Sequence, residues 1–126
     1  MKTLGTHIGN KFRLLRFTGI ITGGAMIMKI IDTPYLLAEK EKHIQRVMKL
    51  ENVFVANIQL KAGEEIPKHD SKKEVIIAVR KGAVMFDVEG TEVVVTEENV
   101  LHMDPLEMHS LRAVEDTDLL VIQVTP

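Results

Sequence analysis

Short runs of apolar residues separated by polar turns dominate the chain from residue 53 to its end. The runs are rich in Val, Ile and Leu, and they lie at residues 53–60, 75–79, 83–88, 92–95 and 119–124. Residues of these types favour β-strands, and no long helical pattern alternates with the runs. Turns containing Gly63, Gly82 and Gly90 separate several of them. This punctuation predicts an all-β fold, either a sandwich or a barrel.

The segment before residue 53 has a mixed pattern. Ile30 and Ile31 predict a short strand, and Thr33 followed by Pro34 matches the cap and first position of a helix. We therefore predict a short helix, of a few turns at most, after Thr33. At residues 43–50 the apolar spacing suits either a helix or a strand, and we favour a strand.

Composition narrows the class of protein. A chain of 126 residues with 45% hydrophobic and 27% charged residues is typical of one folded domain. The absence of Cys excludes disulfides, thiolate metal ligands and a Cys nucleophile, and it suits a reducing, cytoplasmic location. A formal net charge of -2 lacks the basic character that nucleic-acid binding requires. We therefore expect no nucleic-acid partner.

The first 28 residues differ from the rest of the chain, because they hold four basic residues and no acidic one. Gly and Thr interrupt their apolar run, and Lys29 follows it closely, so we expect neither a secretion signal nor a membrane span. We expect an N-terminal extension over residues 1–28 and a domain over 29–126. One interpretation takes Met26 or Met28 as the natural start, and the alternative is that the extension pairs with a partner subunit.

Residues 63–82 resemble the first motif of the cupins, in which a Gly is followed by one or two His, a Glu and a second Gly. The matching positions are Gly63, His69, Glu74 and Gly82. Residues of these types at this spacing make a more specific signal when a second motif follows.

The second motif lies at the distance found in the family. Residues 99–113 are similar to the cupin stretch in which a Pro, here Pro105, shortly precedes a His, here His109, and a strand. The resemblance covers residues 29–126 and implies a small single-domain cupin. It implies a double-stranded β-helix, or jelly-roll barrel, commonly assembled as a homodimer.

This chain departs from the family pattern in both motifs. His69 stands alone where two His separated by one residue are usual, and Glu107 replaces the usual Gly of the second motif. If Glu74 fixes the register instead, the two His positions fall on Lys68 and Asp70, and Asp70 would supply an oxygen ligand.

The resemblance implies that His69, Glu74 and His109 are metal ligands. Two imidazoles and a carboxylate suit Fe, Mn, Zn, Ni or Co. Residues 69 and 74 would face opposite ways in an uninterrupted strand, so joint ligation requires a turn or bulge at residues 70–73. Each residue also has a plainer interpretation. His69 would then lie in a surface loop, Glu74 would be a solvated charge, and His109 would be hydrogen-bonded at the barrel mouth.

Other residues suggest less chemistry. His102, between Leu101 and Met103 on an expected strand, is interpreted as an outward-facing structural residue. Met85, Met103 and Met108 would line an adaptable pocket or, as we favour, fill the core. No phosphate loop, serine nucleophile or catalytic carboxylate pair is evident, so we expect no nucleotide cofactor.

Three functions remain. The favoured one is a cupin barrel that binds a divalent metal, a small organic ligand or both; if it is an enzyme, metal-dependent oxidation or isomerisation is expected. The second is a metal-free binding module or sensor, and the third is a structural or dimerisation module with a filled barrel. We expect a small-molecule ligand, no membrane partner and a homodimer.

Overall fold

The computed structural model describes residues 20–23 and 26–126, and the chain divides into two units, Met1–Asp32 and Thr33–Pro126. In the first unit, β1 (Ile20–Gly23) and β2 (Met26–Lys29) form an antiparallel hairpin. The prediction of a strand at Ile30 and Ile31 is wrong, because β2 ends at the preceding residue, Lys29. The remainder of the expected extension lies outside the described residues.

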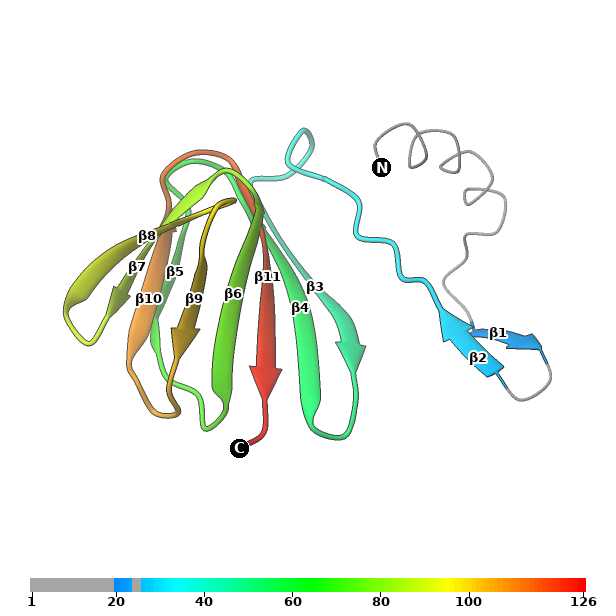
Figure 1. Cartoon of the computed structure of the whole chain (residues 1–126). Coiled ribbons are helices and arrows are strands. Elements are labelled where there is room, and N and C mark those ends of the chain that lie inside the picture. The colour runs from blue at the N-terminus through cyan, green and yellow to red at the C-terminus, as the bar shows by residue number, and fades with distance from the viewer. Residues whose placement is uncertain (1–19, 24–25) are drawn as a thin grey trace. The chain divides into compact units, whose positions relative to one another are not determined.

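The second unit consists of two antiparallel sheets (Figure 1). The five-stranded sheet has the order β3 (Lys42–Lys49), β4 (Val53–Leu60), β11 (Thr117–Val124), β6 (Glu74–Lys81) and β9 (Val100–Met103). The four-stranded sheet has the order β5 (Glu65–His69), β10 (His109–Ala113), β7 (Ala83–Val88) and β8 (Thr91–Thr96). The all-β prediction is confirmed, as is the strand favoured over a helix at β3.

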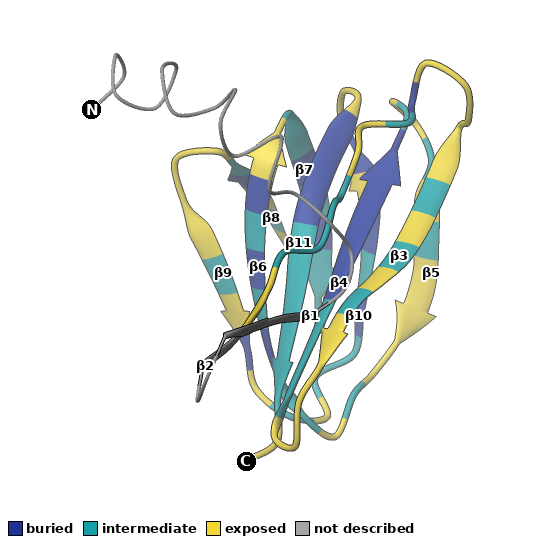
Figure 2. Cartoon of the chain, turned by 90° about the vertical axis from the view of Figure 1, so that its right-hand side faces the viewer, coloured by how far each residue is buried: buried dark blue, intermediate teal, exposed yellow. Residues whose placement is uncertain are grey.

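The core lies between the two sheets, because each central strand places alternate side chains inward. In β6 the buried residues are Val75, Ile77 and Val79. Figure 2 shows buried segments on the central strands β4 and β6, whereas the edge strands β3 and β9 are largely exposed. Met103 is 1% exposed within this core, which confirms its interpretation as core filler.

The helix predicted after Thr33 is not confirmed, because no residue in the described part of the chain is helical and residues 37–39 form a single turn. The backbone here bonds to a side chain of the sheet instead. The Leu36 N–H donates to Gln59 Oε1 at 2.8 Å, and the Pro34 carbonyl accepts from Gln59 Nε2 at 2.8 Å. With Leu37 buried as well, tertiary contacts override the local capping pattern.

A buried polar network lies beneath this segment, on the outer face of the five-stranded sheet. The Asp118 carboxylate accepts two hydrogen bonds from Arg80, from Nε and Nη2, both at 2.9 Å, and one from Asn57 Nδ2 at 2.8 Å. The Arg80 Nη1 donates to Thr33 Oγ1 at 2.8 Å. Arg80 therefore links the first residue of the second unit to the centre of the sheet. The described residues include no helix long and apolar enough to cross a membrane.

Candidate functional site

His69 and His109 come together at one end of the barrel. His69 is the last residue of β5, His109 is the first residue of β10, and the two are paired in register across the strands. Their ring centroids lie 4.2 Å apart, with an angle of 64° between the rings. A register shift in β10 between His109 and Leu111 locally changes the pairing with β5. Two of the three predicted metal ligands are thus neighbours.

Backbone carbonyls fix the hydrogen position on both rings. His69 Nδ1 lies 2.8 Å from the Pro67 carbonyl oxygen, and His109 Nδ1 lies 3.0 Å from that of Glu107. Because a carbonyl oxygen only accepts, each Nδ1 must carry the hydrogen, and in the neutral ring Nε2 then keeps a free lone pair. This is the arrangement by which a protein orients an imidazole as a metal ligand.

Both imidazoles line a cavity of about 140 Å³ between the sheets. The lining residues are Phe54, Ala56, Ile58, Ile66, His69, Val75, Ile77, Phe86, His109, Leu111, Val121 and Gln123. The polar side chains among them are the two His and Gln123, and none of these lining residues is Asp, Glu, Lys or Arg. For comparison, an engineered apolar cavity of about 150 Å³ in another protein binds benzene.

Burial lowers the pKa of His109, and the positive charge of a protonated His69 lowers it further. The hydrogen bond to the Glu107 backbone and the charges of Asp70 and Glu107 raise the pKa in the opposite direction, but burial dominates. His109 is therefore neutral near pH 7. The neutral form is the one that coordinates a metal or accepts a hydrogen bond at Nε2.

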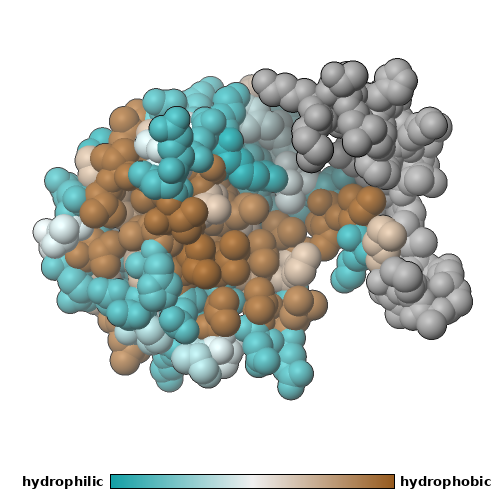
Figure 3. All heavy atoms as spheres, in the orientation of Figure 1, coloured by the Kyte–Doolittle hydropathy of each residue, from teal (hydrophilic) through white to brown (hydrophobic). Residues whose placement is uncertain are grey.

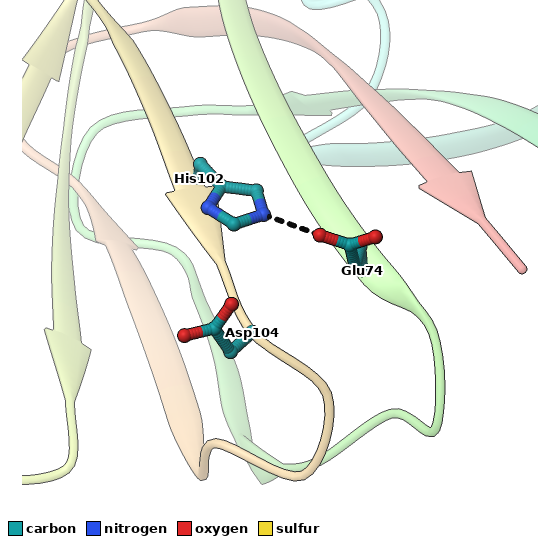
Figure 4. Close-up of side chains that lie close together, drawn as sticks. All are labelled: Glu74, His102 and Asp104. Atoms are coloured by element: carbon teal, nitrogen blue, oxygen red, sulfur yellow. Dashed lines mark hydrogen bonds and ion pairs between the residues drawn. The ribbon is translucent and has the colours of Figure 1, made fainter. Parts of the chain in front are cut away.

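The structure does not bring Glu74 to this pair. The loop at residues 70–73 provides the turn that joint ligation required, but it carries the chain from β5 into β6 of the other sheet. Val75 takes the inward position, and Glu74 instead accepts a hydrogen bond from His102 Nε2 at 3.0 Å (Figure 4). His102 is exposed and faces away from the buried Met103, as predicted.

A second group of possible ligands therefore forms around Glu74. Ligand atoms of Glu74, His102 and Asp104 all lie within 4.8 Å of one another, and these residues form the one such group of three found in the described part of the chain. The sequence motifs did not predict this group. The available signal was His102 and Asp104 two residues apart at a strand, which places both side chains on one face. Gln123, in the cavity, was missed because only long-range packing places it there.

Comparisons with known proteins place the fold. No family model and no curated protein matches the sequence. An RmlC-like cupin with a double-stranded β-helix fold from Methanocaldococcus jannaschii is 20% identical, with a TM-score of 0.69 over 79% of this chain and 93% of that one. An RmlC-like cupin from Desulfovibrio desulfuricans is 26% identical, with a TM-score of 0.63 over 75% and 98%.

A salicylate 1,2-dioxygenase from Pseudoaminobacter salicylatoxidans, solved as adducts with gentisate, is 16% identical, with a TM-score of 0.63 over 68% of this chain and 25% of that one. The similarities define the class of the barrel as a double-stranded β-helix, or jelly roll. The chain has the fold of a small single-domain cupin.

Proposed function

We propose that the barrel cavity binds a small organic ligand together with a divalent transition metal held by the Nε2 atoms of His69 and His109. The observation that carries this proposal is the pair of carbonyl hydrogen bonds at Nδ1, which leaves both Nε2 lone pairs free on rings that line the cavity. Imidazole nitrogens suit Zn, Fe, Ni or Co, and Mn is accepted when oxygen ligands complete the set. A bound metal would supply Lewis-acid or, as iron, redox chemistry.

The rest of the coordination would come from the ligand, from water or from Gln123. Glu74, expected as the third protein ligand, is engaged with His102 outside the cavity. The apolar lining favours a ligand with a small hydrophobic body and one oxygen-bearing end directed at the histidines. The dioxygenase that shares the fold was solved with gentisate, an aromatic acid, which makes small aromatic acids the first class of ligand to test.

The test is the metal content of untagged full-length protein purified without chelator. We expect the content of one metal to fall by about one equivalent per subunit in His69→Ala and in His109→Ala, because each variant leaves a single imidazole. His43→Ala is the matched control, since His43 lies on β3 and contacts Lys40, away from the cavity. Equal metal content in all four proteins would contradict the proposal.

Metal-free ligand binding is the second candidate. The small number of protein groups that could bind a metal supports it, because two imidazoles are fewer than the three protein ligands usual at catalytic zinc sites. The Nε2 atoms would then accept hydrogen bonds from a neutral ligand. A screen of small aromatic and enolic acids with and without EDTA separates the two candidates. The main proposal expects EDTA to weaken ligand binding by about tenfold or more, and unchanged binding favours the metal-free module.

A further inference from the structure

Glu74, His102 and Asp104 lie on the outer face of the five-stranded sheet, where β6 and β9 are paired. The register pairs Val75 with Met103 and Ile76 with His102. Val75 and Met103 are buried in the core, so alternate residues on each strand point outward. None of the three lines the cavity, and the group is therefore separate from the histidine pair.

The charges in this group are poorly compensated. Two carboxylates lie close together, and in the described part of the chain neither forms an ion pair with Lys or Arg. The partner of Glu74 is His102, and Asp104 bonds through its backbone N–H to Glu107 Oε1. Like charges held close together disfavour each other, and a bound divalent cation would neutralise both carboxylates.

We infer that Glu74, His102 and Asp104 form a second, surface site for a divalent transition metal. One imidazole nitrogen and two carboxylate oxygens are ligands that Zn²⁺ accepts, and Mn²⁺ or Fe²⁺ accepts the same set. His102 already points at Glu74, and His102 and Glu74 stand on paired strands that hold their backbones in place. Metal binding therefore requires little backbone movement.

The ligand atoms of the three residues need to move only a little to bind a metal. Bonds of about 2.0–2.1 Å to tetrahedral zinc place ligand atoms roughly 3.4 Å apart, against an upper limit of 4.8 Å here. The side chains of Glu74 and His102 are 40% and 51% exposed, so rotation about their side-chain bonds can close the gap. Three protein ligands would leave at least one position open to water or to an incoming ligand.

The test is calorimetric titration of chelator-treated full-length protein with Zn²⁺ alone. In a His69→Ala/His109→Ala background, which removes the cavity imidazoles, we expect about one equivalent of Zn²⁺ still to bind. Adding His102→Ala or Asp104→Asn should weaken that binding tenfold or more, whereas adding His43→Ala should leave it unchanged. A background protein that binds no Zn²⁺, or binding that His102→Ala and Asp104→Asn leave intact, would overturn the inference.

A second measurement covers the case in which the double variant does not fold. In wild-type protein labelled with ¹⁵N, Zn²⁺ should shift the His102 ring nitrogens, and His102→Ala should lower the zinc stoichiometry by about one equivalent. Because His102 is exposed, this variant should keep the fold. Unshifted His102 signals at saturating Zn²⁺ would also overturn the inference. If instead the cavity proposal fails, Zn²⁺ should leave the ring-nitrogen signals of His69 and His109 unshifted.

Discussion

At the scale of single residues, the burial of His109 affects its protonation state. It is 4% exposed, its Nδ1 hydrogen is committed to the Glu107 carbonyl, and burial lowers its pKa. These features hold the ring neutral and leave Nε2 as the free atom. His69, by contrast, is exposed, although its ring has the same kind of carbonyl partner. The two rings therefore place one buried and one accessible imidazole at the same cavity.

The lowered pKa of His109 predicts how stability depends on pH. The unfolded chain binds this proton near the ordinary value of 6.5, whereas the folded protein binds it only at lower pH. Between the lowered pKa of the folded state and the ordinary value of 6.5, the unfolded state therefore holds more protons, and the folded state loses stability as pH falls through this interval. Urea unfolding of metal-free protein between pH 5 and pH 8 should show this loss, and His109→Gln should reduce it.

The control for this prediction is His102→Gln, which removes an exposed imidazole. It should leave the contribution of His109 to the pH dependence in place. Identical pH dependence in wild type and His109→Gln would show that His109 binds its proton equally well in the folded and unfolded states.

At the scale of elements, local sequence decides where a strand ends and turns. Only the part of the site that depends on those turns could be predicted. The motif spacing brought out His69 and His109, and the structure pairs them across β5 and β10. The same spacing suggested Glu74. Once residues 70–73 move the chain to the other sheet, however, Val75 takes the inward position, and Glu74 is left outside. Which residue of a new strand faces inward depends on packing across the barrel.

The fold was more predictable than the site. Runs of Val, Ile and Leu between glycine turns predicted the strands, and Gly63, Gly82 and Gly90 all adopt positive φ at those turns. The helix after Thr33 failed for a non-local reason. Thr33 and Pro34 are residues that commonly begin a helix. However, Gln59, more than twenty residues away, binds the backbone groups that a helix would have used.

The segment that replaces this helix depends on the Arg80–Asp118 pair. Removing the guanidinium leaves a nearly buried carboxylate without its charged partner, and the link to Thr33 is lost as well. We expect Arg80→Leu to lower the free energy of unfolding by about 2–3 kcal/mol, measured by urea denaturation. Arg46→Leu is the control, because Arg46 is exposed, and it should change stability by no more than about 0.5 kcal/mol. Equal effects of the two variants would contradict a stabilising role for the pair.

At the scale of the whole molecule, apolar residues gather on part of one face of the barrel. Figure 3 shows hydrophobic residues gathered across the middle of the visible face, with hydrophilic residues around them. The register places Val55, Ile122 and Ile76 side by side across β4, β11 and β6. All three alternate with cavity-lining neighbours and therefore point outward. All three are half-buried, and an accessible row of apolar residues of this kind is a candidate interaction surface.

The homodimer implied by the family resemblance stays a prediction, and this outer row is where we expect it to form. Sedimentation velocity at micromolar concentration should give a dimer. Ile122→Glu should shift the protein to monomer while the barrel stays folded, because it places a charge in the row. Ser110→Glu, on the other sheet, is the control and should remain dimeric. A wild-type monomer, or a dimer unaffected by Ile122→Glu, would contradict the prediction.

We propose above all that His69 and His109 hold a metal at the cavity. The most direct measurement is anomalous X-ray scattering from crystals of the full chain loaded with the metal found in the purified protein. We expect an anomalous peak about 2.0–2.2 Å from both Nε2 atoms, with cavity density beside it when a small aromatic acid is added. Metal-loaded crystals without a peak between the two imidazoles would contradict the claim.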